Sequence, residues 1–458
     1  MIRKETLNIA LVLLALVLLF MSLSFPALDT IVYSVTLISV YVFVLHLSKR
    51  INFLDVTAMA ACISYLLVPL ITYSMFGKHN KLAVLWQTYM TIDKQEYFSL
   101  ALPGTLALIA GLWVPFWIKI PIQDGQLILN VKKYLANKSY IGILLIFIGI
   151  LAIPFVTWAP PSVSAIFYFG SQLTYIGVIY LLHSNLQLKS MAIAFILILM
   201  LVQSILTGMY GELVYWSVMG VILLVMNKAS LTLTRKLILL GSGIIVLFLI
   251  QSIKHEYRDK VWNGAERGND PALFFSLIVD RVKDPATIFD PERFYKVVVR
   301  ANQGYLVART MDFVPKHEPF AHGETILSSF AASFVPRFLW PDKPKVGGQE
   351  NICRFLGDCG RINYSYNIGQ LGEAYVNFGI VGGCIWMFFY GYILNTLLNV
   401  FRFLSLKRPT LLLWTPLLFY PAMVVETDFL TFINTFVKGI MFCAACYLLF
   451  SLLLKVRL

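Results

Sequence analysis

The amino-acid sequence predicts an all-α polytopic membrane protein, with about 12 transmembrane helices and one large loop on the outer side. Of its 458 residues, 59% are hydrophobic and only 13% are charged, whereas soluble domains are about half apolar and a quarter charged. The apolar runs are long and uninterrupted. They exclude an outer-membrane barrel, whose strands alternate over about ten residues.

Runs of about 20 apolar residues predict the individual spans. Nine of them precede the large loop, near Leu7 to Leu23, Thr30 to Leu47, Phe53 to Met75, Ser99 to Trp117, Ser139 to Trp158, Ala165 to His183, Met191 to Gly208, Glu212 to Met226 and Leu237 to Ile253. Three follow it, near Phe378 to Phe401, Thr410 to Val425 and Leu430 to Leu454. The chain thus divides into residues 1–253, the loop 254–370, and residues 371–458.

The positions of the basic residues indicate how the chain is oriented in the membrane. With the amino terminus inside, the cytoplasmic segments hold 17 basic residues and only two acids, Glu5 and Asp124, which gives a surplus of 15 against a net charge of +13 for the whole chain. Short cytoplasmic loops of membrane proteins carry such an excess. We therefore expect both termini, and the short basic loops, on the cytoplasmic side of the membrane. The charge then gives no reason to expect a nucleic-acid partner.

The large loop, Lys254 to Gln370, differs from the other connections. Its 117 residues hold 16 Lys and Arg and 14 Asp and Glu, and connections of this length are usually functional. Amphipathic helices are expected on the membrane surface over Phe274 to Val282, Arg293 to Phe313 and Gly323 to Phe334. Cys353 and Cys359 lie in this loop; in an oxidising compartment they either pair or remain free thiols.

Familiar signatures of soluble enzymes are absent from the sequence. There is no GxxxxGK[ST], HExxH or GxSxG motif, so ATP hydrolysis and zinc proteolysis are not expected. Two short carboxylate pairs, Asp290 with Glu292 and Glu426 with Asp428, are too common a pattern to predict a metal site. No metal and no other cofactor is predicted.

Basic residues in the loop suggest contact with anions. Arg293, Lys296 and Arg300 are spaced to share one helical face. Arginine suits phosphate because its planar group donates two parallel hydrogen bonds. A helix lying on anionic lipid, or a solvated charged face, would show the same spacing.

Two segments carry a resemblance to a known family. Residues 335–344 read VPRFLWPDKP, and residues 369–383 read GQLGEAYVNFGIVGG. This pair resembles the "PR.LWP.KP" and "GE.Y.NFG..GG" elements of Wzy-type polymerases, which join the oligosaccharide repeat units of O-antigen and capsule. The layout of a dozen spans and one large loop in the second half is also similar. The motifs themselves cover only about fifty residues.

The resemblance implies a glycosyltransferase of the bacterial inner membrane, with a fold like that of the integral-membrane (GT-C-like) polymerases and ligases. It would transfer a growing glycan, linked to undecaprenyl pyrophosphate, onto a new lipid-linked oligosaccharide repeat unit, without a metal. Membrane lipid and a chain-length regulator protein would be its other partners. The family's pattern of Arg-x10-Gly fits twice, at Arg337 with Gly348 and at Arg361 with Gly372.

That reaction requires cations for the leaving pyrophosphate and a base for the attacking hydroxyl. The candidates for holding pyrophosphate or substrate are Arg300, Arg309, Arg337, Arg361, Lys296 and Glu212. Glu373, at the outer end of the tenth predicted span, and His322 are the candidate bases. Each has a structural alternative: Arg337 beside Trp340 as a membrane anchor, Glu373 as a helix-start acid, and His322 as a surface residue.

Two other functions compete with the polymerase. An O-antigen ligase resembles the same family, but the histidine that ligases carry before the final glycine-rich element is replaced here by residues 364–367, Tyr-Ser-Tyr-Asn. A lipid-linked oligosaccharide flippase or transporter would place its polar groups near the middle of the membrane. Here they concentrate in one asymmetric loop.

Overall fold

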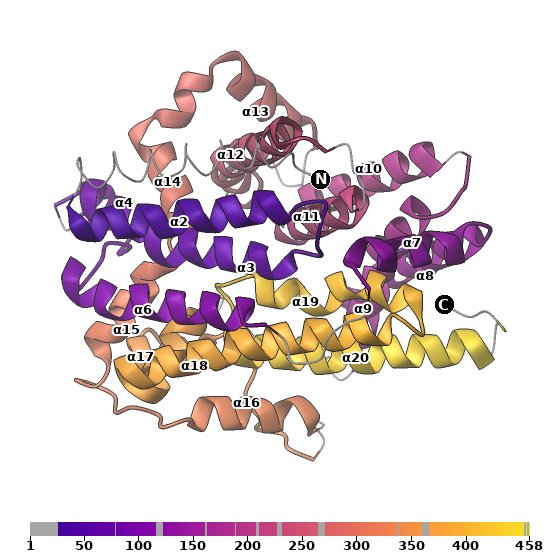
Figure 1. Cartoon of the computed structure of the whole chain (residues 1–458). Helices are drawn as coiled ribbons and strands as arrows, with labels where there is room; N and C mark the ends of the chain where they lie inside the picture. The colour runs from indigo at the N-terminus through magenta and orange to yellow at the C-terminus, as the bar shows by residue number, and fades with distance from the viewer. Residues whose placement is uncertain are drawn as a thin grey trace.

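A computed structural model gives the architecture of the chain. It describes residues 26–77, 79–115, 122–160, 163–187, 189–207, 210–226, 231–263, 271–335, 337, 339–359, 366–452, 455 and 458. Every regular element in these ranges is a helix, and the long helices run side by side as a bundle (Figure 1). The predicted all-helical fold is confirmed.

The helices follow one another without a strand in the described residues. In the first half they are α2 (Ala27–His46), α3 (Phe53–Ala61), η1 (Cys62–Leu67), α4 (Val68–Met75), α5 (Lys81–Leu85), α6 (Lys94–Trp113), α7 (Asp124–Leu135), α8 (Ser139–Trp158), α9 (Ser164–Leu182), α10 (Lys189–Thr207) and α11 (Gly211–Val225). The second half holds α12 (Leu233–Asn263), α13 (Pro271–Lys283), η2 (Pro285–Phe289), α14 (Pro291–Ala301), α15 (Gly304–Phe313), α16 (Glu324–Phe334), α17 (Gln349–Leu356), α18 (Gly369–Leu404), η3 (Pro409–Trp414), α19 (Thr415–Met423) and α20 (Phe429–Leu452).

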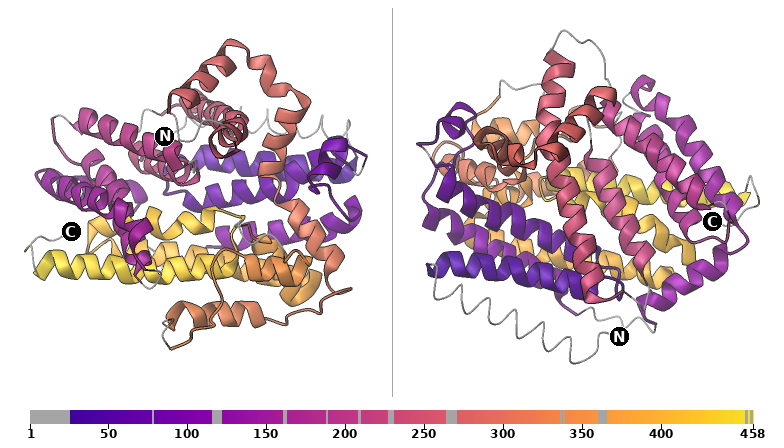
Figure 2. Two further views of the ribbon diagram at one scale, coloured as in Figure 1. Left: turned by 180° about the vertical axis from the view of Figure 1, so that it is seen from behind. Right: turned by 90° about the horizontal axis from the view of Figure 1, so that it is seen from above.

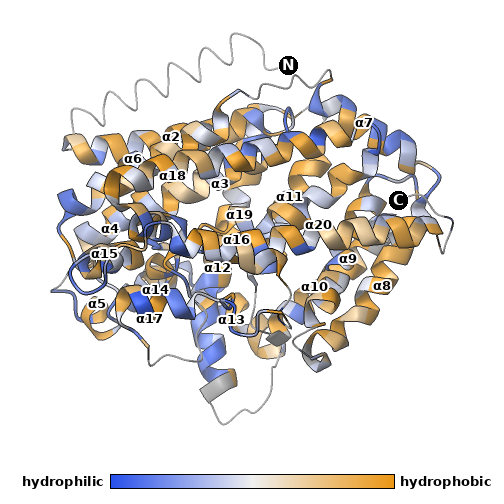
Figure 3. Cartoon of the chain, turned by 90° about the horizontal axis from the view of Figure 1, so that it is seen from below, coloured by the Kyte–Doolittle hydropathy of each residue, from blue (hydrophilic) through white to orange (hydrophobic). Residues whose placement is uncertain are grey.

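Eight helices in the described residues are long and apolar enough to cross a membrane. They are Ala27–His46, Phe53–Met75, Lys94–Trp113, Ser139–Val156, Ser164–Leu182, Leu233–Val261, Gly369–Leu404 and Phe429–Leu452. Two shorter apolar helices, Lys189–Ile205 and Gly211–Val225, coincide with further predicted spans. Hydrophobic residues predominate on the long helices in Figure 3, whereas α7 mixes hydrophilic and hydrophobic residues. The chain is therefore a helical membrane protein.

Two predicted spans need comment. The first, Leu7 to Leu23, lies outside the described residues. The eleventh, Thr410 to Val425, is not one helix, because the 3-10 turn η3 occupies its start and α19 has only nine residues. Nine residues rise about 14 Å, about half of the hydrocarbon core. Pro416, which has no backbone N–H to donate, lies at the start of α19.

Helices α6 and α18 are in close backbone contact. At Gly111 an added Cβ would lie 2.1 Å from the carbonyl oxygen of Phe388, and at Gly391 one would lie 2.4 Å from that of Leu108. Small residues permit such close approach of membrane helices. This glycine contact fixes α18 in place and so positions the residues before it.

Helix α18 changes direction at Gly379, where the backbone has φ 67° and ψ −163° inside the helix. Glycine adopts positive φ without the penalty of other residues. The break separates a first segment, residues 369–378, from the long apolar remainder. The first segment is almost completely buried and carries Glu373 and Asn377.

The loop between α12 and α18 holds more helices than predicted. The expected helix from Arg293 to Phe313 is two helices, α14 and α15, because residues Asn302 and Gln303 are not helical. Helix α17 was not predicted. Helices α14, α15 and α17 gather at one end of the bundle, on the left in Figure 1 and the right in the left panel of Figure 2.

Helix α16 lies along α20 and not across the end of the bundle (Figures 1 and 2). Its outer face exposes Leu327, Phe330 and Phe334. The structure thus places α16 against a candidate membrane helix, and the surface position of the loop stays a prediction. The apolar side chains of α16, at about helical spacing, allow it to pack beside a membrane helix.

Candidate functional site: a cationic cluster and a buried polar junction

Charged and tyrosine side chains meet where α11, α12, α14 and the turn before α20 come together. Arg300 donates from Nη1 to Oε2 of Glu426 over 2.7 Å. Lys254 and Arg258 of α12 interact electrostatically with Arg300, as does Tyr215 of α11. These five residues are called the Arg300 cluster below. Three of its four charged members are basic, so the cluster retains positive charge.

Arg300 is both accessible and electrostatically restrained. Its side chain is 52% exposed. Burial by the surrounding protein acts to lower the pKa of Arg300, but the Glu426 carboxylate offsets this effect and raises the pKa above its ordinary value. Arg300 therefore remains a cation, and part of it stays available to an anion from solvent. Exchange of one carboxylate partner for another oxyanion is ordinary arginine chemistry.

Glu212 lies near the same cluster on α11. Tyr168 donates its hydroxyl to Oε1 over 2.9 Å, and Gln172 donates to Oε2 over 3.4 Å. Tyr420 interacts electrostatically with both Glu212 and Glu426, so Glu212 lies near the carboxylate that binds Arg300. Glu212 also lines a small cavity of about 60 Å³ with residues of α8, α9 and α10.

Glu373 is the centre of a buried polar junction between three helices. Thr325 of α16 donates to its Oε1 over 2.9 Å, and the backbone N–H of Phe429 donates to Oε2 over 2.6 Å. Asn377 donates to the Thr325 hydroxyl over 2.7 Å. Glu373 is only 1% exposed. The carboxylate thus joins α16 and α20 to α18, and its two oxygens already have partners.

His322 lies beside this junction but does not belong to it. The His322 side chain is exposed, and its backbone has a φ of 47°. The next residue, Gly323, donates its N–H to Oδ1 of Asn377 over 3.0 Å. The chain therefore turns sharply at His322, and the hydrogen bond from Gly323 to Asn377 fixes the start of α16.

The PRFLWPDKP segment closes the other end of α16. Lys343 is buried and donates from Nζ to the carbonyls of Ala332 (2.7 Å) and Val335 (2.6 Å). These carbonyls have no partner within the helix, so the lysine caps it. Arg337 is exposed and donates to the carbonyls of Pro341 and Lys343, which holds the turn together.

Replacement of Lys343 by methionine should destabilise the protein by about 1–3 kcal/mol, because two buried carbonyls lose a charged donor. Thermal unfolding in detergent measures this loss. Lys345, two residues along the same turn and exposed, provides the control: Lys345→Met should unfold like the parent protein. Equal stability of both variants would contradict the capping role.

The remaining candidate residues are dispersed. Lys296 pairs with Glu292 of its own helix over 2.8 Å, and Arg293 pairs with Asp290 over 2.6 Å, so the predicted basic face is largely neutralised. Arg309 is half-buried in α15. Arg361 lies outside the described residues.

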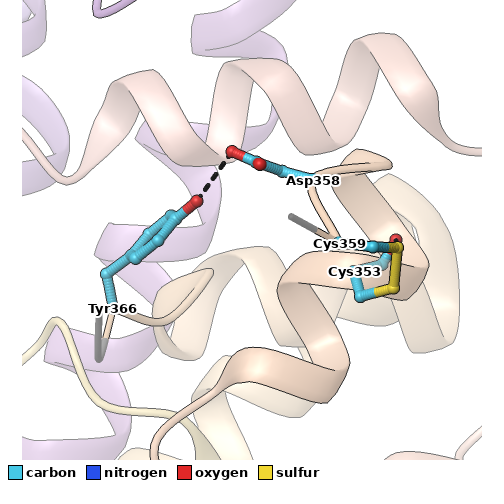
Figure 4. The surroundings of a disulfide bond; sticks show 4 residues. All are labelled: Cys353, Asp358, Cys359 and Tyr366. Atoms are coloured by element: carbon cyan, nitrogen blue, oxygen red, sulfur yellow. Dashed lines mark hydrogen bonds between the residues drawn. A yellow bond between two sulfur atoms is a disulfide. The ribbon is translucent and has the colours of Figure 1, made fainter. Parts of the chain in front are cut away.

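A disulfide joins Cys353 and Cys359 at the end of α17 (Figure 4). Nearby, Tyr366 donates its hydroxyl to Asp358 over 2.8 Å, as Figure 4 shows. The bond closes the short segment between the two cysteines. Of the two possibilities that the sequence left open, the structure contains the pair.

Peptide mapping under non-reducing conditions should recover Cys353 and Cys359 in one linked species. Structural disulfides persist in oxidising compartments and are rare in the cytosol. Cys384, a free and partly buried thiol on α18, is the internal control for alkylation. Free thiols at both loop positions in protein purified without reductant would contradict the bond.

Within the described part of the chain, no group of three or more His, Cys, Asp or Glu residues is arranged to hold a metal ion. Asp290 and Glu292 are bound to basic neighbours, Arg293 and Lys296. Glu426 is bound to Arg300. Three of the four carboxylates noted in the sequence are therefore occupied by cations of the protein itself.

Comparison with known proteins places the chain in a family. The family model described as a domain of unknown function, DUF8712, matches residues 59–402, which is most of the chain. The chain belongs to the DUF8712 family. Neither the search of curated proteins nor that of solved structures finds a match to this DUF8712 protein.

In this DUF8712 chain, sequence reasoning missed Lys254, Arg258, Asn377 and Lys343. Asn377 and Lys343 lie inside the two motif segments, so the motifs contain a usable signal. Lys254 and Arg258 are one helical turn apart on the extension of α12, and that spacing alone predicts a shared face. Their proximity to Arg300 depends on the tertiary fold.

Proposed function

We propose that this protein is a polysaccharide polymerase of the bacterial inner membrane. It transfers a growing glycan from undecaprenyl pyrophosphate onto a new lipid-linked oligosaccharide repeat unit, in the assembly of O-antigen, capsule or exopolysaccharide. The proposal includes twelve spans, both termini in the cytoplasm, a periplasmic loop with the Cys353–Cys359 disulfide, and a GT-C-like architecture. The sequence resemblance and the membrane-embedded bundle support it.

The observation that carries the proposal is the Arg300 cluster, which lies beside helices long enough to span a membrane. A diphosphate carries negative charge that grows as the bond from its oxygen to the anomeric carbon breaks. Fixed cations in a water-poor site stabilise such charge strongly. Arg300 offers a guanidinium that is 52% exposed, and Lys254 and Arg258 add positive charge around it.

The role of the tyrosines follows from the same arrangement. Tyr215 and Tyr420 form an edge-to-face pair with ring centroids 5.5 Å apart, and Tyr215 interacts electrostatically with Arg300. Tyrosine combines an apolar ring with a hydroxyl donor. Such side chains suit a substrate that joins a hydrocarbon tail, a diphosphate and a sugar.

Deletion of the gene from its host tests the proposal. We expect single repeat units on the cell surface and no polymer, because the repeat unit is still made and exported. An empty surface would indicate a flippase, and polymer not attached to its surface anchor would indicate a ligase. Normal long-chain polysaccharide in the deletion strain would exclude the polymerase.

A further inference from the structure

A polar cleft opens between α16, α17 and the start of α20. Its volume is about 180 Å³. The polar side chains that line it include Thr325, Ser328, Ser329, Asn351, Arg354 and Asp428. The cleft is distinct from the Arg300 cluster, since it shares no lining residue with it.

The charged residues around the cleft largely neutralise one another. Arg354 donates to Glu318 over 2.7 Å and pairs with Glu324 over 3.1 Å. Glu350 accepts from the backbone N–H of Lys345 over 3.2 Å. The cleft therefore offers a ligand hydroxyl and amide groups, which both donate and accept hydrogen bonds, beside charged groups of both signs; the lining residues of these kinds are Thr325, Ser328, Ser329, Asn351, Glu324, Lys345, Glu350, Arg354 and Asp428. A neutral ligand rich in hydroxyl groups fits this inventory better than an anion or a hydrocarbon.

Asp428 differs from the other acids that line the cleft. It is 1% exposed, and its Oδ1 accepts from the N–H of Thr431 over 2.8 Å. Asp428 makes no ion pair within the ranges that the structure describes. Burial raises the pKa of Asp428 above its ordinary value. A carboxylate held in this way binds a proton more readily than an exposed one.

The chain connects this carboxylate directly to the Arg300 cluster. Glu426, which binds Arg300, and Asp428 are separated by one residue, so their Cα atoms lie within about 7 Å of each other. One short turn thus contributes a side chain to the cationic cluster and a side chain to the polar cleft. A reaction between a diphosphate-linked sugar and a second sugar needs these two environments close together.

Building on the proposed function, we infer that the cleft binds the acceptor sugar of the lipid-linked repeat unit, and that Asp428 accepts the proton of its attacking hydroxyl. The hydroxyl oxygen forms a bond to the anomeric carbon of the growing glycan. The bond from that carbon to the diphosphate oxygen breaks, and the diphosphate leaves with the electron pair. The hydroxyl proton moves to the Asp428 carboxylate.

Two variants separate binding from chemistry. Asp428→Asn keeps the size of the side chain and one carbonyl oxygen for the Thr431 N–H, but removes the base. Ser328→Trp fills the cleft from α16. Asp280→Asn, an exposed position on α13, is the matched control. The probe for binding is the free repeat-unit oligosaccharide released by mild acid from the deletion strain, observed by saturation-transfer NMR with protein in lipid nanodiscs.

We expect Asp428→Asn to bind the oligosaccharide within about twofold of the parent protein and to lose at least about 100-fold in chain-lengthening rate. Ser328→Trp should lose oligosaccharide binding, while its thermal unfolding stays close to that of the parent. Asp280→Asn should match the parent in both assays.

Parent-like chain lengthening in Asp428→Asn would overturn the assignment of the base, and parent-like binding in Ser328→Trp would overturn the subsite. If the parent protein itself makes no ladder from lipid-linked repeat units, the proposed polymerase fails. The binding assay still decides whether the cleft holds a sugar.

Discussion

Replacement of Arg300 by alanine is expected to reduce chain lengthening at least about 100-fold, while the protein still inserts into the membrane. Loss of one preorganised donor to a developing oxyanion typically costs a factor of about 100–1,000 in rate. Arg300 supplies such a donor, because it lies 2.7 Å from Glu426 and is 52% exposed. The rate is measured as the ladder formed from a defined lipid-linked oligosaccharide by protein in nanodiscs.

Arg300→Lys is the informative companion variant. A lysine keeps the charge but cannot donate two parallel hydrogen bonds, so we expect an activity between those of the parent and Arg300→Ala. Lys316→Ala is the control, because Lys316 is exposed and pairs only with Asp312 of its own loop among the described residues. Full activity of Arg300→Ala would indicate that the Arg300 cluster only binds lipid headgroups. It would also remove the main support for the proposed function.

A cytoplasmic arginine is a poor control here. On the side expected to face the cytoplasm, Arg402 donates to the buried Asp124 and to Asn399 over 2.9 Å. The backbone N–H of Ile51 donates to the same aspartate over 2.8 Å. Removal of Arg402 would leave a buried carboxylate unpaired, which is strongly destabilising. A residue far from the outer-side site would be expected to tolerate replacement, but Arg402→Ala is expected to destabilise the protein.

Replacement of Glu373 by alanine is expected to have the largest effect on stability, a loss of about 2–5 kcal/mol. The N–H of Phe429 and the hydroxyl of Thr325 would each lose a buried partner, and every such loss costs about 1–3 kcal/mol. The cavity left behind adds to this cost. Thermal unfolding in detergent and protease resistance both report the change.

Glu373→Gln distinguishes a structural role from a catalytic one. Glutamine retains one carbonyl oxygen for the Phe429 N–H, so this variant should fold with a loss of about 1–2 kcal/mol and keep most of its activity. Glu324→Gln, on the exposed start of α16, is the control for stability. A well-folded but inactive Glu373→Gln would instead return the role of base to Glu373, which is one of the two candidate bases predicted from the sequence.

The sequence predicts the helical membrane fold well, because length and hydrophobicity alone decide which segments can cross a bilayer. It predicts helix breaks less well. Asn302 and Gln303 separate α14 from α15, and the only local sign of the break is Gly304, directly after them. Helix α16 runs alongside α20 because of packing that no local pattern encodes. The sequence gives a clearer signal for the break between η3 and α19, because Pro409 and Pro416 lie in the first turns of these two helices, where proline is tolerated.

The candidate site shows the same limit. Arg300 and Glu212 were named from their position on the outer side, and in the structure Tyr420 interacts electrostatically both with Glu212 and with Glu426, the partner of Arg300. Lys296 has the right spacing but binds Glu292. The partner of each charge depends on contacts between residues distant in sequence, as with Arg300 and Glu426, which are 126 positions apart. Periodicity within one helix carries no information about such pairs.

The glycine contact between Gly111 and Gly391 also limits the routes by which the hydrocarbon chain of a lipid substrate can enter the protein. The α6 and α18 backbones touch there, with hypothetical Cβ atoms 2.1 to 2.4 Å from neighbouring carbonyls, so no prenyl chain slips between them. Helix α12, in contrast, has only 17% of its apolar stretch buried and carries Lys254 and Arg258 near its far end. If the substrate is a polyprenyl carrier, its route from the surrounding bilayer runs along α12, and bulky substitutions there should slow loading while leaving the chemistry intact.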